Sequence, residues 1–282
     1  MTIQTTVTNP DAFALDIQGL EPQKIIPESL AIMATTRVGI AQADDVFVRV
    51  PHLDLSDDVA WVPEGTAIPE ADPDADESII ATGKLGVLVK LSIEQLRQPN
   101  VTEIVSQEIG RSLTTKINSA LINTVAPVSP AVLPPAGLIA QGTTVATAVA
   151  SNLDGIVNAI SLIQELPGGD ATNVIASPSA WASLQKFKVA TGSNASLLDA
   201  RVDSAEKRLL SVPVHVDSSV PSNKIVVLDK RRVLSAYSDI QVSKSDQAFF
   251  ASDVVGIKAT FRVGAVVTDA LAVQVLTITP PA

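Results

Sequence analysis

One segment of the chain repeats an apolar side chain at every fourth position, and this repeat constrains the fold more than any other feature of the sequence. The repeating positions are Val101, Val105, Ile109, Leu113, Ile117, Leu121 and Val125. This spacing places all of these side chains on one face of an α-helix. Asn100 and Glu103 form a favourable N-terminal capping pair, so the predicted helix spans residues 101–126. At about 1.5 Å per residue such a helix is roughly 37 Å long and must serve as a spine for other elements.

The segment before this helix predicts a long two-stranded ribbon. Residues 46–50 (VFVRV) alternate apolar and polar side chains, and residues 79–91 return with the same alternation. Between Arg49 and Lys84 the chain has no Lys or Arg, but it has nine acidic residues: Asp54, Asp57, Asp58, Glu64, Glu70, Asp72, Asp74, Asp76 and Glu77. An isolated hairpin is only marginally stable in water, so this acidic ribbon needs another surface to lie on.

The remainder of the chain predicts a second module and a return to the first. Prolines and glycines between 127 and 150 forbid a regular helix. Two amphipathic helices, at 153–166 and 178–188, then alternate with short strands at 173–177, 209–216, 224–229 and 239–243, which indicates an α/β module. The last two predicted strands, 254–267 and 271–278, are expected to pack on the spine helix. Before the ribbon, residues 29–38 (SLAIMATTRV) predict a short helix, and residues 1–24 read as an arm with little core of its own.

Composition excludes several classes of function. The chain is 46% hydrophobic but only 3% aromatic, and its formal net charge is −10, so strong binding to nucleic acid is disfavoured. There is no Cys, which excludes disulfides, thiolate metal sites and a cysteine nucleophile. The first twenty residues lack the features of a signal peptide, and no apolar run reaches the length of about 18 residues needed to span a membrane. We therefore expect a soluble protein made in a cytoplasm.

Catalytic and metal-binding motifs are weak. His52 and His215 have no partner at ligand spacing, and no nucleophile elbow, phosphate-binding loop or zinc-binding helix is present. Asp72, Asp74, Asp76 and Glu77 superficially resemble a calcium loop, but the central Gly and the distal Glu are missing, which favours a solvated acidic loop. We expect no enzyme, cofactor or metal. An acidic hydrolase with a carboxylate pair remains a remote alternative.

Charge is distributed unevenly between the ribbon and the second module. Residues 181–232 contain nine basic and five acidic residues, and nine minus five gives +4. An acidic ribbon and a basic module in one chain favour complementary contacts between copies. Two separately solvated faces would explain the same charges equally well.

Four strings of sequence, taken in order, resemble the tailed-bacteriophage major capsid protein family, whose fold encapsulins share. VAWVPEGTAIPEADPDADE (59–77) resembles the family's extended-loop tip, and IASPSAWASLQKFK (175–188) resembles its strand and its helix with Pro and Trp. LLSVPVHV (209–216) is similar to the strand around the family's Leu-x-x-Pro-Val turn. DQAFFASDVVGIKATFRVGAVVTD (246–269) is similar to its return into the peripheral domain.

The resemblance implies an α+β fold of the phage major-capsid type. Its parts would be an N-terminal arm (1–45), an extended loop formed by a long β-hairpin (46–91), a peripheral domain (92–149 and 246–282, with the spine helix 101–126) and an α/β axial domain (150–245). It also implies a structural protein that self-assembles into pentamers and hexamers, forming the icosahedral shell of a virion around a double-stranded DNA genome. Assembly would take place in the cytoplasm of the host bacterium. An encapsulin-like nanocompartment shell is the nearest alternative.

The same resemblance implies partners and contact residues. The partners would be other copies of the chain, together with portal and decoration proteins and either a separate scaffolding protein or none. Packaged DNA would be only weakly contacted, and no membrane is involved. A fused scaffolding domain is not expected, because no long charged helical segment precedes the arm. A Lys–Asn cross-link through Lys84 or Lys90 is not expected either, because no Asn follows Asn223. The candidate contact residues between subunits are Trp61, Glu64, Glu70, Asp72, Asp74, Lys84, Val87, Val89, Arg201, Lys207, Arg208, Arg231 and Arg232.

Overall fold

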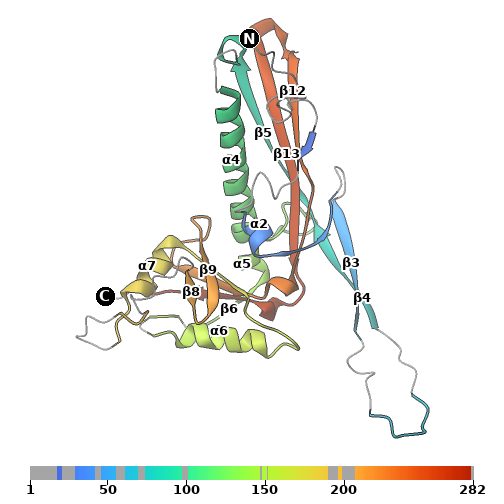
Figure 1. Cartoon of the computed structure of the whole chain (residues 1–282), viewed down its shortest axis with the longest axis vertical. Helices are drawn as coiled ribbons and strands as arrows, with labels where there is room; N and C mark the ends of the chain where they lie inside the picture. Colours follow the sequence, from blue (N-terminus) through green and yellow to red (C-terminus); the bar gives the residue numbers. More distant parts are fainter. Residues whose placement is uncertain are drawn as a thin grey trace, which may run out of the picture.

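The computed structural model describes residues 18–20, 29–41, 46–54, 61–68, 74–96, 101–146, 148–150, 152–189, 196–198 and 207–280. Its centre is the long helix α4 (Val101–Asn123), which lies along a tall sheet (Figure 1). The buried apolar side chains of α4 are four members of the sequence repeat, Ile109, Leu113, Ile117 and Leu121, joined by Ile122. The spine helix is therefore confirmed, and it ends three residues before the predicted 126.

The tall sheet is built around one long strand, β13 (Val254–Val267). One partner is β5 (Gly83–Ser92), antiparallel over ten residue pairs. The other partners are β11 (Val233–Tyr237) and β12 (Ile240–Phe249), to which β2 (Thr36–Gly39) and β1 (Gln18–Leu20) are added. Alternate side chains of β13, including Ile257, Ala259 and Phe261, are buried in the same core as α4. The alternation in the sequence thus placed one face of this strand correctly.

A second sheet forms the lower module (Figure 1). Its strands, in spatial order, are β6 (Thr143–Thr144), β14 (Val273–Thr277), β10 (Lys224–Leu228), β7 (Asn173–Ala176), β9 (Val212–Val216) and β8 (Arg208–Leu209). Helices α6 (Asp154–Gln164) and α7 (Pro178–Lys186) flank it. Ser177 caps α7 by accepting a hydrogen bond from the N–H of Ala180, and Pro178 occupies the first turn.

Strand β10 connects the two cores. Val226 and Leu228 belong to the core that contains α4, whereas Ile225 and Val227 belong to the core that contains α6 and α7. Successive side chains of a strand point to opposite faces of its sheet, so this sheet is buried on both sides. The two modules consequently share one sheet as a common wall.

The remaining elements are short. They are the helices α2 (Leu30–Met33), α3 (Ile93–Leu96) and α5 (Leu138–Gln141), and the 3-10 turns η2 (Lys230–Arg232), η3 (Phe250–Ser252) and η4 (Ala270–Ala272). The predicted helix at 29–38 is thus reduced to one turn, after which the chain becomes β2, parallel to β11. Pairing with β11 supplies backbone hydrogen bonds that override the local helix preference.

Strand pairing also differs from the expected division of the chain. The hairpin consists of β3 (Phe47–Asp54) and β4 (Asp74–Ala81), while residues 83–92 leave it as β5 and pair with β13. Strand β11 belongs to the tall sheet although it precedes the expected boundary at 245/246, and β12, in the same sheet, runs across that boundary. Strand β14 belongs to the second sheet although it follows the boundary. The chain crosses between the two sheets twice in this region, which no local pattern encodes.

Candidate interaction surfaces

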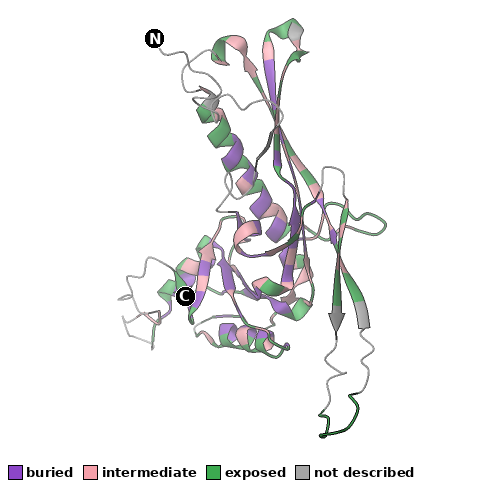
Figure 2. Cartoon of the chain, turned by 45° about the vertical axis from the view of Figure 1, so that its right-hand side comes forward, coloured by how far each residue is buried: buried purple, intermediate pink, exposed green. Residues whose placement is uncertain are grey.

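The β3–β4 hairpin projects from the body of the molecule (Figure 1). Its eight residue pairs run from Phe47 opposite Ala81 to Asp54 opposite Asp74. In the part of the chain that the structure describes, these two strands form a sheet of their own. Exposed residues lie along both strands (Figure 2), among them Phe47 and Ile79. Because two strands alone are marginally stable in water, this geometry favours a hairpin that rests on another surface.

The base of the hairpin is anchored firmly. Ile80 and Thr82 are fully buried, and the N–H of Thr82 donates to the carbonyl oxygen of Val46 at 2.8 Å. The guanidinium of Arg262 on β13 donates to the carbonyl oxygen and the hydroxyl of Thr82, at 3.1 and 3.0 Å. At Gly264 the backbone approaches so closely that a Cβ atom would lie 2.0 Å from the carbonyl oxygen of Ala81. The direction of the hairpin is therefore set by the tall sheet.

The described part of the tip, residues 61–68, carries large exposed apolar side chains. Trp61 is fully exposed and Ile68 is 80% exposed. Between them the chain turns at Pro63–Thr66, where the hydroxyl of Thr66 donates to the carbonyl oxygen of Pro63 and Gly65 adopts a φ of +78°. A fully exposed tryptophan is a strong candidate for an anchor in an interface.

The acidic candidates of the hairpin are only partly described. Glu64 is exposed in the tip turn, Asp74 begins β4, and Glu70 and Asp72 lie outside the described residues. Further along β4, Glu77 lies 3.3 Å from Arg49, and Asp76 lies 3.8 Å from His52. All four of these side chains are well exposed, so each pair contributes at most about 1 kcal/mol.

The candidates on β5 divide between solvent and core. Lys84 is exposed, but Val87 and Val89 are half-buried and pack against the core that contains α4. Their apolar character is thus explained by the subunit itself, because this face of β5 lies towards its own body. A change of either valine to Asp would damage the folded subunit, so such variants cannot isolate a contact between subunits.

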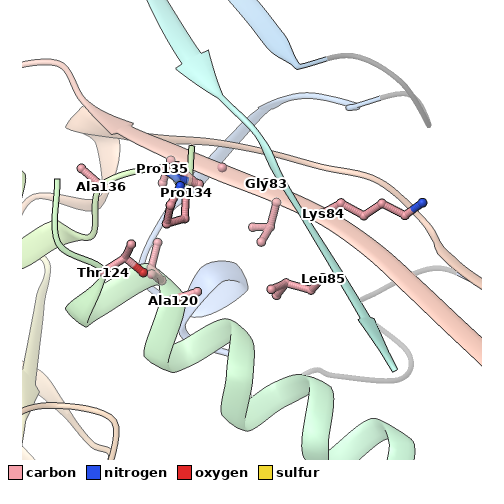
Figure 3. A pocket seen from close by; sticks show the side chains of 12 residues that line it. Gly83, Lys84, Leu85, Ala120, Thr124, Pro134, Pro135 and Ala136 are labelled. Atoms are coloured by element: carbon pink, nitrogen blue, oxygen red, sulfur yellow. The ribbon is translucent and has the colours of Figure 1, made fainter. Parts of the chain in front are cut away.

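An apolar pocket opens beside the start of β5 (Figure 3). Its volume, including the open mouth, is about 510 Å³, and its walls come from β5, the last turns of α4, β13 and the loop that follows α4. Pro134 and Pro135 of that loop face Gly83, whose position leaves no room for a side chain against Pro135. The pocket has no cluster of polar groups suited to catalysis.

Two of the basic candidates are occupied within the chain. Arg231 contacts the buried carboxylate of Asp229 at 3.1 Å and donates to the carbonyl oxygen of Gly168 at 2.9 Å. Arg232 donates to the carbonyl oxygen of Pro167 at 2.6 Å. Burial by itself raises the pKa of Asp229, but hydrogen bonds from Arg231 and from the backbone N–H of Asp170 hold that pKa below its usual value. These two arginines therefore hold η2 against the loop after α6.

The other basic candidates lie apart from them. Lys207 and Arg208 are exposed at the outer end of the second sheet, and Arg201 lies outside the described residues. His215, half-buried on β9, contacts the amide of Asn173 at 3.1 Å. Burial and the positive charge of Lys230 lower the pKa of His215, which fits a neutral imidazole in the body of the module.

A polar junction that the sequence analysis missed joins α4 to both neighbouring parts of the fold. The side-chain oxygen of Asn118 accepts hydrogen bonds from the N–H of Leu30 at 2.8 Å and from the hydroxyl of Ser29 at 3.3 Å. Its amide nitrogen donates to Asp217, after β9, at 2.7 Å. Asn118 is 3% exposed. The sequence feature that could have indicated this junction is the polar residue Asn118 directly after Ile117 of the apolar repeat.

The candidates thus occupy separate places instead of one site: the hairpin tip, β5, the outer end of the second sheet and η2. Within the described residues, no three His, Asp or Glu side chains gather as metal ligands would. Among the helices that the structure describes, none is long and apolar enough to cross a membrane.

Comparisons with known proteins agree on one fold. The model of the phage capsid family matches residues 26–278. A structure from Gordonia phage Cozz is similar over 89% of this chain and 86% of its own, with a TM-score of 0.67 and 14% identity. The capsid of a native GTA particle is similar over 89% and 96%, with a TM-score of 0.66 and 20% identity. A structure from Mycobacterium phage Adephagia covers both chains completely, with a TM-score of 0.63 and 16% identity. No curated protein matches the chain.

Proposed function

The chain belongs to the phage capsid family, and from this premise we propose that it is a major capsid protein whose copies associate into the closed shell of a virion. The similarity to the capsid structures, which extends over most of both chains, supports the same proposal. The role is structural, and we propose no catalytic activity, because the family and the fold are those of shell proteins. The finer proposals are pentamers and hexamers around a double-stranded DNA genome, assembled in the cytoplasm of a host bacterium.

One observation carries this proposal: the hairpin is held in place where it leaves the body and presents exposed apolar side chains at its tip. Arg262 and Gly264 fix its base, while the side chains of Trp61 and Ile68 are exposed to solvent. A single subunit gains nothing from such a projection, since it exposes apolar surface to water. A neighbouring copy that received the tip would bury that surface.

The parts of the fold have proposed roles in this assembly. The N-terminal arm and the hairpin reach across to neighbouring copies, and the module containing α6 and α7 meets its equivalents around the symmetry axes. The body with α4 and the tall sheet forms the wall of the shell. Portal, scaffolding and decoration proteins are the expected further partners, and the net charge of −10 supports a shell that encloses DNA with little direct contact.

Size-exclusion chromatography and electron microscopy of the purified chain test the proposal. We expect capsomers or closed particles, and a chain that stays monomeric at high concentration in the presence of the other virion proteins would contradict it. The content of particles formed in the native host separates the two shell functions. Packaged DNA favours the virion, whereas enclosed protein cargo favours the encapsulin-like alternative.

The contribution of the tip is tested by Trp61→Ser, with Glu64→Gln in the neighbouring turn as a comparison that changes a charge and leaves the apolar side chain in place. Trp61→Ser should abolish or strongly weaken assembly, because it removes the largest exposed apolar side chain of the tip. It should change the unfolding free energy of the unassembled subunit by less than about 0.5 kcal/mol, as expected for an exposed position without contacts. Normal particles from Trp61→Ser would refute the role given to the tip.

A further inference from the structure

The loop that follows α4 is exposed and unusually apolar. We define the uncharged loop as residues 125–134 (VAPVSPAVLP). Val125 is 80% exposed and Val128 is 84% exposed, and Val132 and Leu133 are also exposed. Residues 117–153 contain no Asp, Glu, Lys, Arg or His, so no charge within the loop or beside it in the sequence keeps this surface hydrated. Several large apolar side chains exposed within one short segment are typical of an interaction site.

The uncharged loop is held in one shape. The N–H of Gly137 donates to the carbonyl oxygen of Thr124 at 2.9 Å and so closes the loop at its base. A Cβ atom on Gly137 would lie 2.7 Å from the carbonyl oxygen of Ile122, so the two ends of the loop can approach this closely only with glycine there. Within the loop, the N–H of Ala131 donates to the carbonyl oxygen of Val128 at 2.9 Å. Prolines at 127, 130 and 134 further restrict its backbone.

This rigidity distinguishes the loop from a simple connector. A segment that linked two elements without another role would be expected to be polar and free to move. A preorganised segment loses little conformational entropy when a partner binds, so each exposed valine can contribute most of its burial free energy. The last residue of the loop, Pro134, and the Pro135 that follows it line the pocket beside the start of β5 (Figure 3), which gives the loop a fixed position relative to the rest of the subunit.

We propose that the uncharged loop is a contact surface between copies of this chain, buried against a second copy when the shell assembles. The inference rests on the proposed function. Charge indicates the occupant: each copy carries a net charge of −10, so a contact through an uncharged surface lets two copies meet without placing like charges against each other. A basic partner would instead be attracted to the acidic hairpin. A charge-free apolar surface suits a partner with the same acidic charge as the subunit itself.

Cysteine labelling tests this directly, because the chain has no Cys of its own. Val128→Cys introduces one thiol at the most exposed apolar position of the loop, and Val125→Cys provides a second, independent position. Both should react rapidly with a maleimide in unassembled subunits and in denatured particles. In intact particles the rate should fall by more than about tenfold, because a buried thiol is neither ionised nor reachable. Equal rates in subunits and intact particles would overturn the inference.

Assembly of charged variants provides the second measurement. Val128→Glu should raise the concentration needed for assembly by more than about tenfold, because it would bury an unpaired charge in the contact. Val128→Thr, which keeps the shape of valine without a charge, should assemble nearly normally. Both should leave the thermal unfolding of the unassembled subunit unchanged, since residue 128 is almost fully exposed there. Normal assembly of Val128→Glu would overturn the inference.

The outcomes separate this inference from the proposed function. If the unaltered chain forms no particles or capsomers, the proposed function fails and the inference fails with it. If the unaltered chain assembles and the thiol stays reactive, only the inference fails. Protection that appears only when another virion protein is added would assign the uncharged loop to that protein and would also overturn the inference.

Discussion

Replacing Asn118 by Ala should destabilise the subunit strongly, because Asn118 joins three parts of the fold. The change removes the acceptor for the N–H of Leu30 and the donor to Asp217. Leu30 is 2% exposed, so its N–H would lose its partner in a place that water reaches poorly. Hydrogen bonds to a charged group are worth about 1.5–3 kcal/mol and an unsatisfied buried donor costs about 1–3 kcal/mol.

These contributions are not additive, since Asp217 also accepts from the N–H of Ser219 at 2.7 Å and keeps that partner. Ala is in addition a better helix former than Asn, by up to about 0.7 kcal/mol, which offsets part of the loss. The expected net decrease in the free energy of unfolding is therefore about 2–4 kcal/mol. A loss of this size is a large fraction of the stability of an ordinary domain.

Urea denaturation of the unassembled subunit, followed by circular dichroism, measures this difference. The matched control is Asn123→Ala, which makes the same chemical change at an exposed position of the same helix and should alter stability by less than about 0.5 kcal/mol. A double-mutant cycle with Asp217→Ala should give a favourable coupling of about 1 kcal/mol or more between the two side chains. Equal effects of Asn118→Ala and Asn123→Ala, or a coupling of zero, would refute the junction.

Three further outcomes are expected. Gly264→Ala should destabilise the subunit by about 1–3 kcal/mol in the same assay, because its Cβ would lie 2.0 Å from the carbonyl oxygen of Ala81. The control Gly86→Ala should be nearly neutral, because its Cβ would come no closer than 3.4 Å to Thr260 and 3.7 Å to the carbonyl oxygen of Ala259. Similar losses in the two variants would contradict the anchoring of the hairpin. Asp229 has a lowered pKa in the folded subunit, so its contribution is complete above the unfolded pKa of about 3.9 and is lost as the pH falls further. Asp229→Asn should thus be less stable than the unaltered chain at pH 7 and lose less stability on acidification, and an unchanged pH profile would argue against the Asp229–Arg231 contact. His215 also has a lowered pKa, so stability should decrease as the pH falls below about 6.5, and His215→Gln should flatten this dependence in denaturation curves taken between pH 5 and 8.

The candidate surfaces could be predicted only where the local sequence is unusual. The exposed Trp61 belongs to a string that resembles the tip of a capsid extended loop, and the structure places that side chain fully in solvent. Arg231 and Arg232 were selected for their charge, yet their partners, Asp229 and the carbonyl oxygens of Gly168 and Pro167, belong to the same chain. The sequence gives the number of charged residues in a segment, but it does not show which of them already bind a partner within the same subunit.

The uncharged loop shows the opposite case. Its prolines predicted an irregular boundary after the spine helix, which is what the structure contains. Apolar residues in such a segment are compatible with burial in the subunit, and only the fold shows that Val125 and Val128 are left in solvent. Whether a side chain is covered depends on elements distant in the sequence, so exposure is not a local property.

The sequence by itself determined the elements whose periodicity is local: the spine helix α4, the helices α6 and α7 and the alternating strand β13. Hydrophobic side chains repeating with the period of a helix or a strand fix the buried face of that element wherever its partner lies. Only the tertiary structure decided which strands pair, since β5 left the hairpin for β13 and β14 joined β10 in the second sheet. Strand partners are chosen by backbone hydrogen bonds that any residue except proline can make, so the choice belongs to the packing of the whole chain and not to the sequence of any one strand.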